Sequence, residues 1–328
     1  MNSVAIILPT YKRRLDLIRC VQSIALSASR SCLDVSVDIY NNDPDDPLDK
    51  AQLGHSFGSI KISITNRPEN TGPRGNIYMS LRDTYSKNPR DVYVFLSDDD
   101  FVLPDFFSRL ESAFLNGSDA AIFSCVVLAE QEMHKPGFVI ARSHTYRFVP
   151  TRPYASKRLQ FITDSRLLSG SAYSHGLLER FFDYISLSQQ NESFFCSLWY
   201  QMAFLASFSV SPSFIEDPCL CHAQGNTTHW GDIENYREFF LGRIDMFSEM
   251  YNAHNINAAE RDALVVDFIS HQNPSRVLRV LASRKLPVLI CSRIAIKAMA
   301  VNFIFRVSSL ASALARRLPS MAKFLLKI

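Results

Sequence analysis

The order of apolar runs and helix-like segments in the first third of the chain restricts its fold more than any other feature. Strand-like patches cover residues 4–8, 35–40, 61–65 and 92–96, and the run at 4–8 is typical of a buried strand. Apolar residues recur at helical spacing over residues 14–28 and 76–85. This alternation predicts a parallel sheet with helices on both faces. Ligands of such sheets bind at the carboxyl ends of the strands, so the residues directly after each strand are the first candidates for function.

The residues after the first predicted strand offer three kinds of group that suit a nucleotide. Pro9, Thr10 and Tyr11 supply backbone donors, a hydroxyl and an aromatic ring that can stack on a base. Lys12 and Arg13 supply positive charge for phosphate. This loop alone would not predict nucleotide binding, so the residues after the other strands are needed to support the prediction.

Polar segments also follow the second and third predicted strands. Asn41, Asn42 and Asp43 come directly after the second strand. The third strand leads into the motif Asn70-x-Gly72-x-x-Gly75-Asn76, a glycine-bearing turn before a helix, where the backbone can approach a ligand closely.

Three consecutive carboxylates, Asp98, Asp99 and Asp100, close the fourth predicted strand. Carboxylates gathered in this way repel one another and are costly without a counter-charge. A hard divalent cation supplies that charge through oxygen ligands and can bridge a diphosphate. A solvated acidic turn is the alternative interpretation of this motif taken alone.

In their order and spacing, these four motifs resemble those of the family 2 glycosyltransferases of the GT-A fold, especially those that build bacterial surface polysaccharides. The resemblance covers residues 1–110. It implies an α/β, Rossmann-like GT-A mixed sheet flanked by helices. It also implies a metal-dependent, inverting transfer of a sugar from a nucleotide-diphosphate donor to an acceptor hydroxyl, with Mn²⁺ or Mg²⁺ as the cofactor.

The resemblance implies a role for each matching residue. The nucleotide-sugar contacts would be Pro9, Thr10, Tyr11, Arg13, Asn42, Asp43, Asn70, Gly72, Arg74, Asn76, Asp98 and Asp99. The cation ligands would be Asp100, Asp98 and His229, and the acceptor site would include Gly170 and Trp230. The family often has a single Asp after the second strand, whereas this chain has Asn41-Asn42-Asp43, which leaves the base of the donor open.

Inverting transfer needs a general base that takes the proton of the acceptor hydroxyl. In the family this carboxylate starts a helix about ninety residues after the metal motif, and Glu192 lies at that distance, just before a predicted apolar helix over residues 194–209. Glu192 is therefore the candidate base, with Asp183 and Asp217 in reserve. The alternative is an acidic first-turn residue that only complements the helix dipole.

The remaining chain suggests two regions. We expect residues 1–232 to form the catalytic domain, with a nucleotide-sugar half at 1–110 and an acceptor half at 111–232 that contains strands at 120–128 and 138–148. Residues 233–328 are expected to be helical, with one helical stretch at about 233–269.

Charge separates the chain into an acidic body and a basic tail. Residues 276–328 carry eleven Lys and Arg and no Asp or Glu, while residues 1–275 carry 24 basic and 32 acidic residues. From Arg306 onward, polar residues recur every three or four positions, which predicts a basic amphipathic helix. We expect this helix to bind an anionic membrane surface, and packing on the acidic body is the alternative.

Several patterns bear on location and partners. Residues 4–8 follow no basic segment, and no run reaches about eighteen apolar residues, so the sequence predicts neither a signal peptide nor a spanning helix. Seven scattered cysteines predict reduced thiols. We therefore expect a peripheral protein on the cytoplasmic face of the inner membrane, which acts on a polyprenyl-diphosphate-linked oligosaccharide and binds no nucleic acid.

Two other functions stay open at this point. A nucleotidyltransferase shares the need for a nucleotide diphosphate and carboxylate-bound metal, although residues 9–11 lack the glycine-rich loop usual after its first strand. A non-catalytic membrane-associated scaffold would use the carboxylates only as a surface turn. The absence of a Walker motif and of a dinucleotide fingerprint argues against ATPase and dehydrogenase functions.

Overall fold

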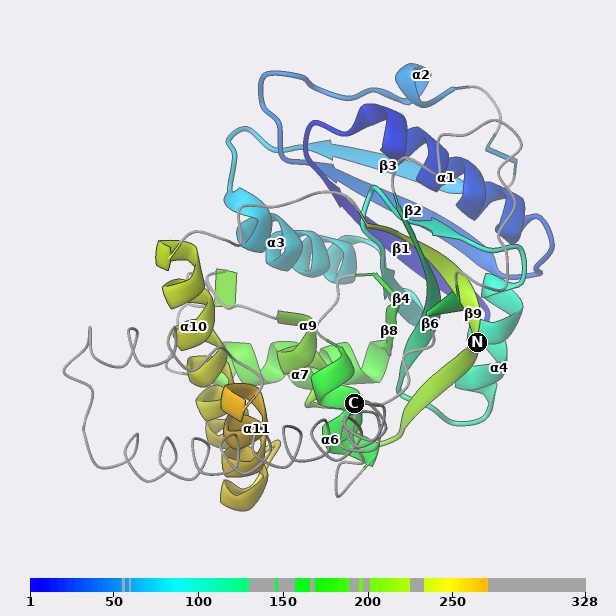
Figure 1. The fold of residues 1–328 in the computed structure, drawn as a ribbon. Coiled ribbons are helices and arrows are strands. Elements are labelled where there is room, and N and C mark those ends of the chain that lie inside the picture. Colours follow the sequence, from blue (N-terminus) through cyan, green and yellow to red (C-terminus); the bar gives the residue numbers. More distant parts are fainter. Residues whose placement is uncertain are drawn as a thin grey trace, which may run out of the picture. The chain divides into compact units, whose positions relative to one another are not determined.

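A computed structural model gives the fold of the chain (Figure 1). It describes residues 1–54, 57–58, 60–129, 145–146, 157–165, 169–188, 195–196, 201–224 and 233–270. The chain forms two compact units, Met1–Met246 and Phe247–Ile328. The expected domain boundary after residue 232 stays a prediction.

The first four strands form a parallel sheet, as predicted. They are β1 (Ser3–Thr10), β2 (Asp34–Asn41), β3 (Lys61–Asn66) and β4 (Val92–Phe95), in the spatial order β3-β2-β1-β4. β1 lies at the centre, and its residues from Val4 to Leu8 are completely buried. A strand covered on both faces needs apolar side chains in both directions, which explains the unbroken apolar run.

The sheet continues beyond β4 with mixed strand directions, which confirms the expected mixed α/β fold. The added strands are β8 (Ser171–Ser174), β6 (Ala120–Ala129), β9 (Pro212–Gln224), β5 (Phe101–Val102) and β7 (Thr145–Tyr146). β8 runs antiparallel to β4 and β6, and β9 runs parallel to β6. β5 is antiparallel to β9, and β7 is antiparallel to β6. Of the strand expected at 138–148, only β7 lies within the described residues.

One face of the sheet is covered by α1 (Arg14–Ala28), α2 (Lys50–Leu53) and α4 (Phe106–Leu115) (Figure 1). Alternate residues of β1, including Ile6 and Leu8, share a buried apolar cluster with Val21 and Ile24 of α1 and with Phe106 of α4. Every second residue of the strand therefore packs against the apolar side of a helix, whose residues repeat every three or four positions.

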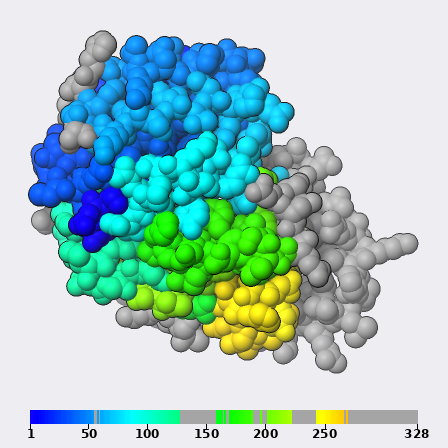
Figure 2. Space-filling model, turned by 180° about the vertical axis from the view of Figure 1, so that it is seen from behind, coloured from blue at the N-terminus to red at the C-terminus, as the bar shows by residue number. Residues whose placement is uncertain are grey.

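The opposite face is covered by α3 (Gly72–Lys87), α7 (His175–Leu187) and α9 (Gln201–Ala206). Figure 2 shows α3, in cyan, beside the green segment that contains α7. Three strand tyrosines are buried on this side, and their hydroxyls are hydrogen-bonded. Tyr40 pairs with Thr84 of α3 at 2.8 Å, Tyr93 pairs with the His175 ring, and Tyr173 donates to the Met202 carbonyl. Aromatic burial with satisfied hydroxyls stabilises this interface.

One helix ends earlier than predicted. The helix expected over 194–209 ends at Ala206, because the Ser207 hydroxyl bonds back to the Phe204 carbonyl. Arg158 of α6 (Lys157–Asp164) donates to the carbonyls of Ser207 and Ser209, which follow the helix.

The single helical stretch expected at 233–269 is interrupted. α10 (Ile233–Asn252) stops before His254, which has a left-handed φ of 55°. α11 (Ala258–Ser270) starts afresh, because Asn257 and Glu260 exchange hydrogen bonds in a capping box. Within the second unit, Phe247 and Phe268 pack edge to face. None of the helices that the structure describes combines the length and apolarity needed to cross a membrane.

Candidate active site

Asp98 is buried at the carboxyl end of β4, beside the end of β1. Its Oδ2 accepts a hydrogen bond of 2.6 Å from the Thr10 hydroxyl, and its Oδ1 lies 3.1 Å from Nη1 of Arg13. Burial raises the pKa of Asp98 to about 6, although the bonds from Thr10 and Arg13 act in the opposite direction. The parallel pairing of β1 and β4 therefore brings together residues 88 positions apart.

Arg13 bridges two of the three carboxylates. The same Nη1 atom lies 2.7 Å from Oδ2 of Asp99, whose other oxygen accepts a bond from the Ser97 hydroxyl. Lys12, directly before Arg13, has a left-handed φ of 58°, a conformation that is costly for a residue with a side chain. The loop between β1 and α1 thus holds Arg13 against Asp98 and Asp99.

Asp100 is completely buried, so it is not part of a solvated acidic turn. The chain turns back at this point: the Asp100 amide donates to the Ser97 carbonyl, and the next residue enters β5. Cys20, Cys125 and Cys221 are buried close enough for the Asp100 charge to raise their pKa further, after the larger effect of burial. These thiols are therefore protonated and unreactive.

The charge of this cluster suits a divalent cation. Asp98 and Asp99 both pair with Arg13, and Asp100 adds a third carboxylate directly after them in the chain. The neighbouring Asp99 charge adds to the rise in the pKa of Asp98, after the larger effect of burial. Carboxylate oxygens are the ligands that Mg²⁺ and Mn²⁺ prefer. Among the described residues, no group of three His, Cys, Asp or Glu side chains is already arranged around one point as a metal site.

Asn42 links the end of β2 to the glycine-bearing turn before α3. Its Nδ2 donates to Oδ1 of Asn70 and to the Gly72 carbonyl, at 2.9 and 3.3 Å. Its Oδ1 accepts from the amide and the hydroxyl of Thr71, both at 3.0 Å. Gly72 has a φ of 71°, a conformation that glycine adopts readily. The predicted residues Asn42, Asn70 and Gly72 therefore form one hydrogen-bonded unit.

Other predicted contacts lie around this unit. Asn76 is buried and donates to the Tyr40 carbonyl, and buried Asp43 accepts a bond from the Asp45 amide. Tyr11 is 42% exposed and lies near the Lys12 ammonium, so its ring is accessible to a stacking partner. Pro9 and Thr10 are the last residues of β1.

Arg67 is a buried residue at the third strand end that the sequence analysis passed over. Its Nη1 lies 2.7 Å from Oδ2 of Asp83, its Nε donates to Asn76, and its guanidinium stacks on the Tyr40 ring at 4.9 Å. Its position directly after β3 was the available signal, because the residues directly after each strand are the first candidates for function. Arg67 fixes α3 against the ends of β2 and β3.

Gly170 lies on the acceptor side of the same edge, with a φ of 92° and a packed environment. Its carbonyl accepts from the Phe123 amide, and the neighbouring Ser169 hydroxyl accepts a 2.6 Å bond from the Ser97 amide. The turn before β8 is therefore tied to the segment that carries the carboxylates.

The other predicted site residues have different outcomes. Glu192, His229 and Trp230 lie outside the described residues. Asp183 is exposed on α7, and Asp217 of β9 pairs with Arg109 of α4 at 2.6 Å. Arg74 is in the first turn of α3, where its carbonyl accepts a bond from Gln201.

Solved glycosyltransferase structures share this fold at low sequence identity. The crystal structure of S. aureus TarS 1-349 has a TM-score of 0.55 and 15% identity, over 91% of this chain and 79% of that chain. Its complex with UDP-GlcNAc has a TM-score of 0.55 and 14% identity, over 82% and 72% of the two chains. The mannosyltransferase PcManGT from Pyrobaculum calidifontis, in complex with GDP-Man and Mn²⁺, has a TM-score of 0.51 and 13% identity, over 96% and 80%.

Sequence comparison identifies the family more directly than the shared fold does. No curated protein sequence is significantly similar to the chain. The family model described as glycosyl transferase family 2 matches residues 5–177, which is more than half of the chain and contains the strand ends described above. The chain therefore belongs to glycosyl transferase family 2, and it is a glycosyltransferase.

Proposed function

We propose that this glycosyltransferase moves a sugar, with inversion at the anomeric carbon, from a nucleotide diphosphate to an acceptor hydroxyl in a reaction that requires Mn²⁺ or Mg²⁺. The observation that carries the proposal is the cluster of Asp98, Asp99 and Asp100 at the carboxyl edge of β1 and β4, where Arg13 bridges Asp98 and Asp99. A site with excess negative charge and one partly exposed guanidinium suits a cation together with a diphosphate.

The donor would lie along the strand ends. Tyr11 would stack on the base, and the turn fixed by Asn42 would offer backbone donors, while Arg13 would donate to the phosphates. Neighbours of the same fold have been solved with UDP-GlcNAc and with GDP-Man, which supports a nucleotide-sugar donor and leaves the base open.

Asp100 and Asp98 would hold the cation, with His229 as a third ligand from the sequence. A bound divalent cation supplies positive charge that stabilises the diphosphate leaving group. The hydrogen bond from Thr10 orients Asp98, and the bond from Ser97 orients Asp99. PcManGT, a neighbour in fold, was solved with Mn²⁺.

The acceptor hydroxyl would attack as it loses its proton to Glu192, near Gly170 and Trp230. We expect Glu192→Gln to lower turnover by roughly two to four orders of magnitude, with nucleotide affinity almost unchanged, because the amide cannot take a proton. Steady-state kinetics and calorimetric titration measure the two effects. A normal rate would transfer the role to Asp183 or Asp217.

The basic tail supports a proposal for the acceptor substrate and for the location of the enzyme in the cell. We propose a polyprenyl-diphosphate-linked oligosaccharide at the cytoplasmic face of the inner membrane, in surface-polysaccharide synthesis such as that of O-antigen. Residues 276–328, with eleven cations and no anion, would hold the enzyme at an anionic surface next to a lipid-linked substrate. The transferred sugar would be a hexose or a deoxyhexose.

A panel of nucleotide sugars tests the proposal directly. We expect the purified protein to hydrolyse one donor slowly, to release a nucleoside diphosphate, and to stop when the cation is chelated. Asp100→Asn should abolish cation-dependent nucleotide binding, because it removes one charge and changes the shape of the side chain little. Asp105→Asn is the control, since Asp105 pairs with Arg109 outside the site.

Two results would contradict the proposal. Turnover of the Asp100→Asn variant at the wild-type rate, with or without chelator, would show that Asp100 holds no cation. Release of pyrophosphate in place of a nucleoside diphosphate would identify a nucleotidyltransferase.

A further inference from the structure

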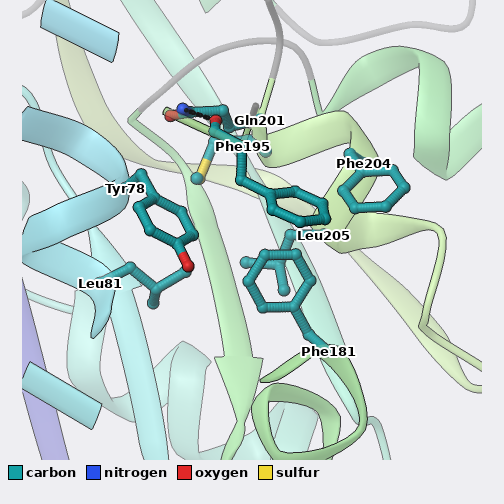
Figure 3. A pocket seen from close by; sticks show the side chains of 8 residues that line it. Tyr78, Leu81, Phe181, Phe195, Gln201, Phe204 and Leu205 are labelled. Carbon is teal, nitrogen blue, oxygen red and sulfur yellow. Dashed lines mark hydrogen bonds between the residues drawn. The ribbon is translucent and has the colours of Figure 1, made fainter. Parts of the chain in front are cut away.

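Gln201 connects two segments that are far apart in the sequence. It is the first residue of α9, and its Nε2 donates to the Phe195 carbonyl at 2.7 Å and to the Arg74 carbonyl at 3.1 Å. Figure 3 shows Gln201 at one end of a small apolar pocket, with Phe195 beneath it and Tyr78 of α3 on the other side.

The orientation of this amide is fixed by its two acceptors. Rotating the amide by half a turn would place Oε1 against two carbonyl oxygens, so both bonds require Nε2 in its present place. Oε1 is buried, and it has no hydrogen-bond partner among the residues that the structure describes. An unsatisfied buried acceptor is destabilising. The stabilisation that the two donated bonds provide is therefore offset in part by this unsatisfied acceptor.

Both bonded segments belong to the proposed reaction. Arg74 is in the first turn of α3, directly after the turn that Asn42 fixes on the donor side. Phe195 follows the candidate base, Glu192, by three residues. Its ring packs between Tyr78 and Phe204, with centroids at 6.3 and 6.0 Å, so a rigid aromatic contact supports the same connection.

We propose that Gln201 is a positioning residue, which holds the segment around Phe195 in register with the donor-side turn of α3. This inference rests on the proposed function, in which the sugar donor and the candidate base Glu192 must be held at a suitable distance. Gln201 touches no reacting atom in this account and acts through the two backbone carbonyls. A small displacement of a catalytic segment is enough to reduce a rate strongly, whereas nucleotide binding depends on the strand ends.

The variant Gln201→Met separates positioning from stability. Methionine has a similar length, removes both donated bonds, and also removes the unsatisfied oxygen. We expect little change in melting temperature, and Kd for UDP or GDP with Mn²⁺ within about threefold of the wild type, but a fall of about tenfold or more in kcat on the donor that the wild type consumes. Hydrogen exchange should become faster in α9 and in the first turn of α3.

Two further variants complete the test. Gln201→Glu keeps the shape but sets a carboxylate against two carbonyl oxygens, so its kcat should fall at least as far. Leu81→Ala is the matched control, because Leu81 lines the same pocket from α3 and donates no hydrogen bond from its side chain. It should lower the melting temperature and keep kcat per folded molecule near the wild-type value.

The proposal is overturned if Gln201→Met keeps the wild-type kcat, or if its exchange pattern is that of the wild type. It is also overturned if Leu81→Ala loses kcat to the same extent, since any damage to the pocket would then explain the effect. If the wild type binds neither UDP nor GDP and consumes no nucleotide sugar, the proposed function fails, while hydrogen exchange still decides whether Gln201 connects the two segments.

Discussion

At the scale of single residues, burial and hydrogen bonding act in opposite directions on the pKa of Asp98. Burial raises its pKa to about 6, and the ordinary value in an unfolded chain is 3.8. Between these two values the folded protein retains a proton that the unfolded chain has released. The contribution of Asp98 to stability is therefore complete below about pH 4 and is lost as the pH rises through about 6.

The pH dependence of unfolding tests this balance. With a chelator present, we expect the free energy of unfolding of the wild type, relative to Asp98→Asn, to fall by about 2 to 3 kcal/mol between pH 4 and pH 6.5. The comparison with Asp98→Asn matters because Asp34, with a lowered pKa, gives the opposite slope in both proteins. Denaturant titrations measure the difference. An equal slope in the two proteins would show that Asp98 is ionised throughout.

The sequence predicted those site residues whose spatial neighbours are set by the pairing of parallel strands. Thr10, Arg13 and Asp98 meet because β1 and β4 are adjacent, and that adjacency follows from the alternation of strands and helices. Gln201 and Arg67 were missed, because their partners are set by how α9 and α3 pack on the sheet. No spacing in the sequence encodes such contacts.

At the scale of elements, the contact between α3 and the ends of β2 and β3 depends on a buried ion pair. The side chains of Arg67 and Asp83 are 6% and 11% exposed, and their charged atoms are 2.7 Å apart. Asp83 also lies near two further cations, Arg82 and Lys87. The Arg67 guanidinium also contacts the Asn76 amide and the Tyr40 ring, neither of which carries a charge. Arg67 is therefore the partner that suffers more when the pair is broken.

A double-mutant cycle measures this contact. We expect Asp83→Leu to cost about 3 to 5 kcal/mol, because it leaves the buried Arg67 charge without its carboxylate. The double variant Arg67→Met/Asp83→Leu should cost clearly less than the sum of the two single changes. Asp217→Asn breaks an exposed pair with Arg109 and should cost only about 0 to 1 kcal/mol. Additive costs at Arg67 and Asp83 would contradict the buried-pair account.

Strands were predicted more closely than helix ends, for a physical reason. Apolar runs mark the buried strands β1 and β4 directly, and alternating apolar residues mark β2 and β3, so all four strands lie within two residues of their expected bounds. Helix ends depend on local caps. α3 starts at Gly72 and not at residue 76, because Pro73 suits the first turn, and Asn257 starts α11 where one continuous helix was expected.

At the scale of the whole molecule, the chain separates an acidic body from a basic tail. Residues 1–275 carry eight more acidic than basic residues, and residues 276–328 carry eleven basic residues alone. The tail lies outside the described residues, so its role stays a prediction from sequence. All the site residues predicted or described above precede residue 231, and the reaction and the membrane contact are therefore separable by truncation.

Truncation after Asn273 should release the protein from vesicles that contain anionic lipid and leave donor hydrolysis intact. Each well-placed Lys or Arg near such a surface contributes about 1 kcal/mol to binding, and the apolar side of the helix predicted from Arg306 onward should add to this. Sedimentation with vesicles measures the release, and neutral vesicles are the control. High salt should weaken attachment only in part, because it screens charges and leaves apolar burial unaffected. Sedimentation of the truncated chain would assign membrane binding to the body, and complete release of the full chain by salt would reduce the tail to an electrostatic arm.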